Sequence, residues 1–145
     1  MSPCLFAIFI DDFVTKLKSL GLGCNTILTC TSIFLYAEDI MLISPSVSML
    51  QTMLHVCESE LVDLNMSLNV KKSVCMRFGP RFNATCANLT TLGGDLLAWV
   101  GICRYLGVTF RVLERLNPVL TTVKLVFTAH LTPFTVVLVV VLRLK

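Results

Sequence analysis

Apolar positions in the first part of the chain recur at helical spacing. Ser2 followed by Pro3 is a favourable helix start, and Gly21 is a typical residue to end one. Asp11 and Asp12 interrupt the apolar pattern and are expected on a solvated face. One amphipathic helix is therefore predicted between Pro3 and Gly21, with an apolar stripe formed by Leu5, Phe6, Phe9, Phe13, Leu17 and Leu20.

The pattern then changes to one that favours β-strands. Residues 27–36 are rich in β-branched and aromatic side chains, and a second apolar run covers residues 40–43. Only Ala37, Glu38 and Asp39 separate the two runs. Two strands joined by a very tight turn are predicted here.

The remaining pattern predicts a second helix and further strands. Residues 44–65 keep a helical repeat, and a strand is predicted over 74–78, where Gly79 and Pro80 end it. Short strands with glycine bends are expected in 92–100 and 102–110, as a hairpin and its neighbour. The order predicts an α+β fold, in which two helices pack on one face of an antiparallel sheet that carries a small extra hairpin.

Composition allows one domain and points to an unusual surface. The chain has 145 residues, 14% of them charged, and a net charge of +3, which is compatible with a polyanionic partner without establishing one. A hydrophobic content of 55% indicates either a membrane segment or a core that lacks its partners. The seven cysteines lack the paired spacing of a zinc site and are expected to be reduced. Without a secretory signal, the expected location is intracellular.

The candidate chemistry lies in the tight turn. Glu38 and Asp39 are adjacent carboxylates between two apolar strands, where their repulsion is unfavourable unless something compensates for it. A divalent cation such as Mg²⁺, which prefers hard oxygen ligands, would do so and would serve nucleotidyl transfer. An ordinary acidic turn is the alternative.

Four segments in order carry a family resemblance. Residues 34–40, Phe-Leu-Tyr-Ala-Glu-Asp-Ile, resemble the Tyr-Ala-Asp-Asp turn of reverse transcriptases of LINE-type (non-LTR) retrotransposons. Residues 2–13 look like the end of that family's template-side motif and its following helix. Residues 69–73 look like the motif after the second palm helix, and 104–108 resemble the primer-grip hairpin. The resemblance implies a partial palm domain over 1–109, followed by a weakly matched hydrophobic tail over 110–145.

The resemblance also implies roles and partners. Glu38 and Asp39 would be the catalytic, metal-binding pair, with Mg²⁺ as the ion. RNA template, DNA primer and deoxynucleotides would be the partners, in the nucleus or the cytoplasm. Residues that would contact nucleic acid or nucleotide are Tyr36, Lys71, Lys72, Tyr105 and Gly107. The plainer alternatives are a solvated basic pair at 71–72 and an ordinary strand and bend at 105–107.

Two departures from the family pattern matter for activity. The family takes another catalytic aspartate from an upstream strand, and the sequence as given begins after it. Glu38 stands where the family has its principal metal-binding aspartate, and its extra methylene adds about 1.5 Å of reach. Because a misplacement of ~1 Å can cost roughly 10²-fold in rate, this chain is not expected to polymerise DNA by itself.

The hydrophobic tail supports a different class of function. Residues 125–142 contain no Asp, Glu, Lys or Arg over 18 positions, which meets the length criterion of about 18 for a membrane-spanning helix. His130 and Pro133 weigh against such a helix, and residues 136–141 also suit a buried strand. The alternative is a small non-enzymatic membrane-associated or interaction protein that uses this tail. A third possibility is a chain from a decayed element with no selected function.

Overall fold

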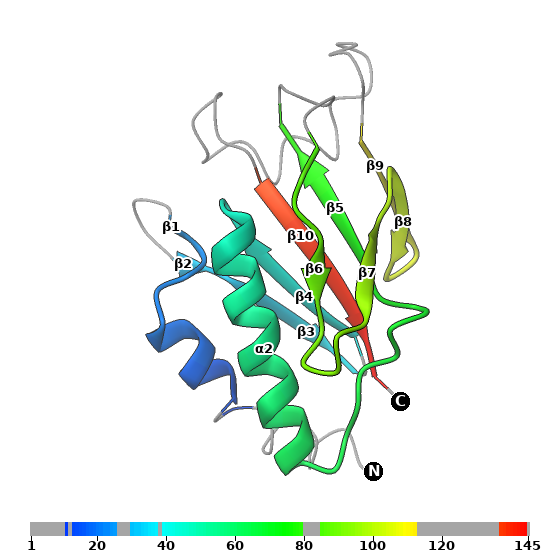
Figure 1. Cartoon of the computed structure of the whole chain (residues 1–145). Coiled ribbons are helices and arrows are strands. Elements are labelled where there is room, and N and C mark those ends of the chain that lie inside the picture. The colour runs from blue at the N-terminus through cyan, green and yellow to red at the C-terminus, as the bar shows by residue number, and fades with distance from the viewer. Residues whose placement is uncertain are drawn as a thin grey trace.

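The fold is built around one six-stranded sheet with helical cover (Figure 1). The computed structural model describes residues 11, 13–25, 30–37, 39–79, 85–112 and 137–144. Residues 13–19 are helical. The other elements are β1 (Cys24–Asn25), β2 (Cys30–Thr31), β3 (Ile33–Tyr36), β4 (Asp39–Ser44), α2 (Val47–Asp63), β5 (Val74–Phe78), β6 (Leu89–Thr90), β7 (Leu96–Trp99), β8 (Ile102–Tyr105), β9 (Val108–Arg111) and β10 (Val137–Arg143).

The strand order places the last strand in the middle of the sheet. It runs β3-β4-β10-β5-β7-β6, and every pairing is antiparallel except that of β5 with β7. Figure 1 shows β10 in red between β4 and β5. β10 is therefore the element that joins β3 and β4 to the remaining strands.

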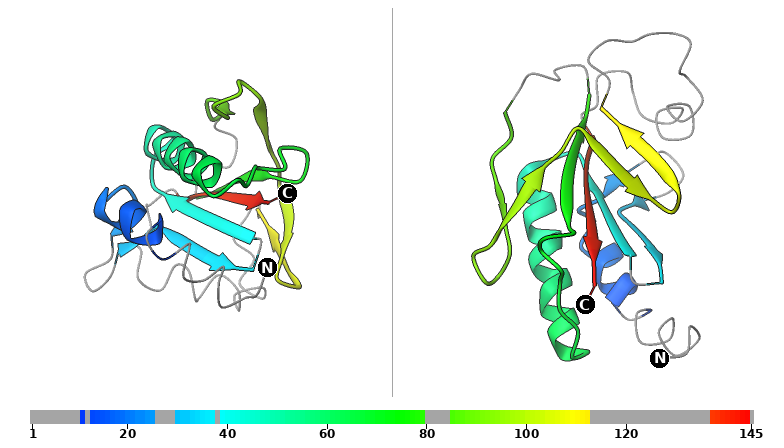
Figure 2. Two further views of the ribbon diagram at one scale, coloured as in Figure 1. Left: turned by 90° about the horizontal axis from the view of Figure 1, so that it is seen from below. Right: turned by 90° about the vertical axis from the view of Figure 1, so that its right-hand side faces the viewer.

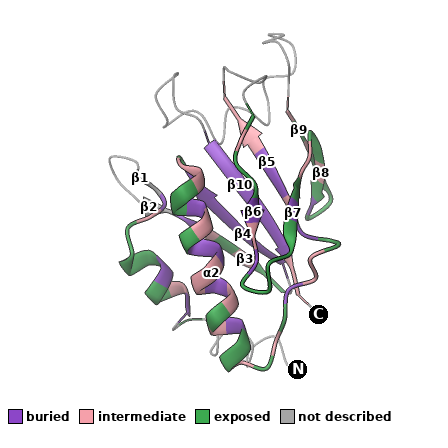
Figure 3. Ribbon diagram, in the orientation of Figure 1, coloured by how far each residue is buried: buried purple, intermediate pink, exposed green. Residues whose placement is uncertain are grey.

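Both faces of the central strands are buried, which explains their uninterrupted apolar sequences. On β4, Ile40 and Leu42 belong to the core cluster beneath α2, whereas Met41 belongs to the cluster on the opposite face. β10 divides in the same way, with Val140 towards α2 and Val139 away from it. Figure 3 shows this burial along β4 and β10.

The helix α2 starts where a capping side chain satisfies its first turn. Ser46 has an extended backbone, and its hydroxyl accepts a hydrogen bond from the backbone N–H of Met49 at 3.4 Å. Asn65 follows the helix with φ 54°, a left-handed conformation that often ends helices. The buried stripe of α2 that faces the sheet consists of Leu50, Met53, Leu54, Cys57 and Leu61.

Polar side chains of the helices complete the packing on this face. The amide of Gln51 donates to the carbonyl of Thr90 at 2.6 Å and accepts from its N–H at 2.9 Å, so it clamps β6 against α2. An ion pair between Lys16 and Glu60 joins the helix of residues 13–19 to α2. Phe13 and Leu17 enter the same core cluster as α2. Both helices therefore cover one face, and the β8–β9 hairpin packs on the other (Figure 2).

The predicted α+β fold class is confirmed, with local differences. The strand Val74–Phe78 has the predicted bounds, and the predicted 44–65 helix is observed as Val47–Asp63. The predicted 27–36 strand is interrupted, because Ser32 separates Cys30–Thr31 from Ile33–Tyr36. Residues 92–94 form a turn rather than a strand, and residues 2–10 and 26–29 lie outside the described part.

The hydrophobic tail contributes a strand to the sheet. Residues 137–143 form β10, whereas 125–136 lie outside the described residues. Within the part of the chain that the structure describes, no helix has the length and apolar character needed to cross a membrane.

The central position of β10 predicts a large cost for removing its core methyl groups. Val140→Ala should lower the free energy of unfolding by about 2 kcal/mol, because two methyl groups leave a fully buried site. The matched control is Val62→Ala, where the side chain on α2 is 66% exposed and the change should be close to zero. Urea unfolding followed by circular dichroism measures both. Equal effects would show that β10 does not lie in the core.

Buried thiols should make the fold sensitive to alkali. Burial, with a smaller contribution from Cys86, raises the pKa of Cys75 from 9.0 to about 12, and burial also raises the pKa of Cys57. Because the folded pKa exceeds the unfolded one, this stability is complete below pH 9.0 and is lost as pH rises towards 12. Cys75→Val should weaken the dependence of the urea midpoint on pH above 9.0, whereas Val140→Ala should leave that dependence unchanged.

Candidate functional site

The acidic turn connects two paired strands, β3 and β4. Tyr36 of β3 lies opposite Asp39 of β4, which leaves Ala37 and Glu38 as a two-residue connection. Ala37 has φ 47°, a left-handed conformation that two-residue hairpins commonly require. The sequence pattern placed Asp39 in the turn, whereas in the structure it is the first residue of β4. The side chain of Glu38 lies outside the described residues.

Asp39 is buried and held by an arginine of the last strand. Its Oδ2 accepts a hydrogen bond from Nη1 of Arg143 within an ion pair, and Nη2 of Arg143 donates to the carbonyl of Arg104 at 2.9 Å. Asp39 is only 6% exposed. Its other oxygen, Oδ1, is buried without a hydrogen-bond partner among the described residues. Only one of the two carboxylate oxygens therefore has a hydrogen-bond partner within the described part of the chain.

The β8–β9 hairpin brings Tyr105 to the same place. Tyr105 pairs with Val108, and the two intervening residues, Leu106 and Gly107, have φ 49° and 78°. Positive φ at both positions defines a type I′ turn, in which glycine is favoured at the second position. Burial raises the pKa of Tyr105, the negative charge of Asp39 raises it further, and Arg143 opposes both. The Tyr105 hydroxyl therefore lies close enough to Asp39 and Arg143 for their charges to affect it.

The basic pair also lies at this end of the sheet. The N–H of Asn69 donates to the carbonyl of Arg143 at 2.7 Å, and the N–H of Arg143 donates to the hydroxyl of Ser73 at 3.1 Å. Lys71 and Lys72 occupy the turn between these two anchors and are exposed. The structure therefore gathers the described candidate residues around the end of β10.

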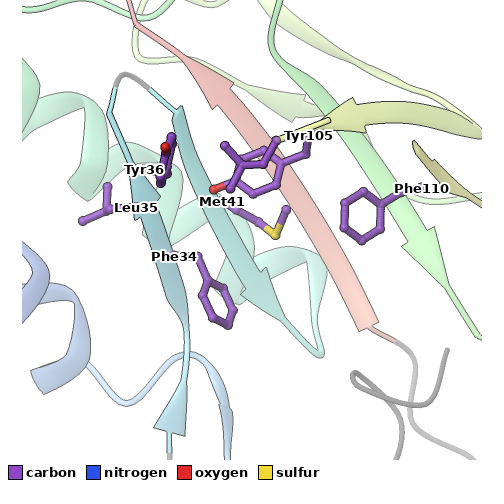
Figure 4. Close-up of a pocket in the computed structure, with 7 residues that line it drawn as sticks. Phe34, Leu35, Tyr36, Met41, Tyr105 and Phe110 are labelled. Carbon is purple, nitrogen blue, oxygen red and sulfur yellow. The ribbon is translucent and has the colours of Figure 1, made fainter. Parts of the chain in front are cut away.

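An apolar hollow lies beside the acidic hairpin. It has a volume of about 200 Å³ and is lined by Phe34, Leu35, Tyr36, Met41, Tyr105, Leu106 and Phe110. Figure 4 shows side chains from β3, β4 and the β8–β9 hairpin around it. Tyr36 is 63% exposed. An exposed aromatic ring of this kind can stack on a nucleic-acid base.

Sequence reasoning missed two contributors to this site. Arg143 was not among the candidate residues, and Phe110 was expected only as the end of a strand. Nothing in the sequence spacing indicates that Arg143 lies opposite Asp39, because 104 positions separate them. An isolated arginine at the end of a strongly apolar run was the available signal, since a charge there needs a partner.

The described side chains do not fit a divalent metal site as they are arranged. Among them, no group of three or more His, Cys, Asp or Glu residues could hold a metal ion. One oxygen of Asp39 is already bound to Arg143. The unsatisfied Oδ1 is a single ligand, and a positive charge beside it disfavours a second cation.

The family comparison assigns the chain. The model of the family described as reverse transcriptase (RNA-dependent DNA polymerase) matches residues 1–110. The chain therefore belongs to the reverse transcriptase family, whose members polymerise DNA on an RNA template, bind template and primer, and use divalent metal ions. Comparison with curated proteins and with solved structures found no match.

The buried hydroxyl of Tyr105 predicts a stabilising substitution. This oxygen has no hydrogen-bond partner among the described residues, so Tyr105→Phe should raise the free energy of unfolding by about 1 kcal/mol. The raised pKa adds a pH dependence, because stability from the neutral phenol is complete below pH 10.0 and lost above it. Tyr105→Phe should remove this alkaline loss. Tyr36→Phe, at an exposed position, is the control and should change neither quantity; a destabilised Tyr105→Phe protein would reveal an essential partner for the hydroxyl.

Proposed function

We propose that this chain is part of the palm domain of a LINE-type, non-LTR retrotransposon reverse transcriptase, and that it does not polymerise DNA by itself. In this proposal residues 1–109 are the palm part, and 110–145 are a weakly matched hydrophobic tail that would begin as the connection to the thumb. The compartment would be that of the element's replication, the nucleus or the cytoplasm.

The observation that carries the proposal is the convergence of three segments at one end of the sheet. The β3–β4 hairpin brings Asp39 there, the β8–β9 hairpin brings Tyr105, and the turn after α2 brings Lys71. These segments are far apart in sequence, and each carries one of the motifs that resemble the family. A chance acidic turn would not require the other two segments beside it.

The site residues have distinct roles in this proposal. Glu38 and Asp39 would correspond to the catalytic carboxylates, for which Mg²⁺ is the ion in the parent enzymes. Lys71 and Lys72 are exposed cations suited to phosphate groups of template, nucleotide or pyrophosphate. Tyr36 is exposed beside an apolar hollow, where it could contact a primer. Tyr105 is buried and would support the adjacent hairpin, whose turn exposes Gly107.

Polymerisation would require groups that the described residues do not provide. A site for two metal ions needs further oxygen ligands beside Asp39, and here that carboxylate is paired with Arg143. Glu38 in place of aspartate adds a second obstacle, because a longer side chain shifts the carboxylate by more than ~1 Å. We therefore infer that an upstream palm segment would have to complete the site.

Primer extension tests this function directly. Four proteins are compared on a homopolymer template and primer with Mg²⁺ or Mn²⁺: the chain, its Glu38→Asp variant, and each of these fused to an upstream palm half that supplies the further aspartate. We expect extension only from the fused proteins, with at least about 10²-fold more from the Glu38→Asp fusion. Asp39→Asn in that fusion is the matched control and should abolish extension.

Each outcome bears on a separate part of the proposal. Extension by the unfused chain would contradict the claim that it needs an upstream half. Extension by the Glu38→Asp fusion alone would indicate a decayed polymerase. Absence of extension from all four proteins would reject the polymerase function and favour a non-enzymatic interaction protein.

A further inference from the structure

We propose that Arg143 is a built-in counter-ion of Asp39, whose guanidinium takes the place of a metal cation and excludes divalent ions from this carboxylate. The inference rests on the proposed function only in that Asp39 is the position at which a metal would otherwise bind. It concerns a residue outside the family-matched region, which ends at 110.

The strand register sets the position of Arg143. β10 pairs with β4 over six consecutive positions, from Leu138 opposite Ser44 to Arg143 opposite Asp39. A shift by one residue would turn Arg143 to the other face and would expose the apolar residues that both faces bury. The contact between the two charges is therefore specified by the packing of the whole strand.

The backbone and the guanidinium of Arg143 are also held from two other segments. Asn69 and Ser73, from the turn before β5, hydrogen-bond to its carbonyl and its N–H at 2.7 and 3.1 Å. The carbonyl of Arg104, on β8, accepts from Nη2 at 2.9 Å. These two segments, together with Asp39 itself, thus hold the arginine in one orientation.

Electrostatics explain why this contact would exclude a metal ion. A carboxylate that is 6% exposed is costly to bury unless a positive charge compensates for it. Arg143 supplies that charge permanently, because a guanidinium stays protonated at any ordinary pH. A divalent ion approaching Oδ1 would be repelled by this charge at close range.

The sheet topology adds a steric condition. β4 has two neighbours, β3 and β10, so both of its edges are already paired. A further strand that brought another carboxylate directly beside Asp39 would have to displace β10 or β3. Displacing β10 would remove Arg143 at the same time, which would couple the arrival of the carboxylate to the release of the counter-ion.

The test measures Mn²⁺ binding to the full chain without any polymerase assay. The variants are Arg143→Met, which removes the charge, and Arg143→Lys, which keeps it. In Arg143→Met, Asp39 is left as an uncompensated buried charge, so stability should fall and Mn²⁺ should restore it. We expect electron paramagnetic resonance to show affinity for Mn²⁺ at least about tenfold higher in Arg143→Met than in the wild type or Arg143→Lys.

A double variant identifies the binding group. Arg143→Met combined with Asp39→Asn removes both charges and should lose the gain in Mn²⁺ affinity. Equal affinity in the wild type and Arg143→Met, or a gain that survives Asp39→Asn, would overturn the proposal. Absence of Mn²⁺ binding by Arg143→Met would overturn it as well.

A measurement on the wild type keeps the proposal testable if Arg143→Met does not fold. The guanidinium NMR signals of Arg143 should persist when Mn²⁺ is added, because the ion stays away from the pair. Broadening of these signals by Mn²⁺ would overturn the proposal. The primer-extension test has an independent outcome: higher Mn²⁺ affinity in Arg143→Met without extension by any fusion would uphold the counter-ion and reject the polymerase function.

Discussion

The fold depends on the pairing of β10 with both β4 and β5. The backbone of β10 hydrogen-bonds to both neighbours, whose edges would otherwise be unpaired. Its side chains pack into the core clusters on both faces of the sheet. The family-matched residues thus receive the centre of their sheet from a segment outside the match. The high hydrophobic content of the sequence follows in part from this arrangement, because the buried positions of this strand, residues 137–142, are all apolar.

The same strand decides the electrostatics of the candidate site. Its apolar part is inside the sheet, and its terminal arginine reaches the one described carboxylate of the acidic hairpin. The turn after α2 and the β8–β9 hairpin both bond to that arginine, so the three motif-bearing segments are held together by Arg143. The site is consequently organised around an organic cation, although the family to which the chain belongs works with divalent metal ions.

Local patterns were sufficient to predict much of the fold. The α+β class, the strand Val74–Phe78, the helix α2 and the tight connection between β3 and β4 follow from periodicity, capping and breaker residues that act over a few positions. The place of β10 could not be predicted in this way, since a run such as residues 137–142 suits a buried strand and a membrane segment equally. The ion pair of Asp39 was beyond reach for the same reason, because strand register depends on tertiary packing. The roles of Tyr36, Lys71, Lys72, Tyr105 and Gly107 remain predictions, although the structure places them around one end of the sheet.

A sheet whose middle strand comes late in the sequence has a consequence for how the protein is made. Asp39 and Arg143 are 104 positions apart, so the contacts that unite the sheet are among the most distant in the chain. Folds dominated by such contacts form slowly, because the entropy of closing a long loop is lost before the contact forms. During synthesis β4 and β5 would leave the ribosome well before their common neighbour, with unpaired edges and exposed apolar faces. This interval is when the growing chain is most open to aggregation and most in need of a chaperone.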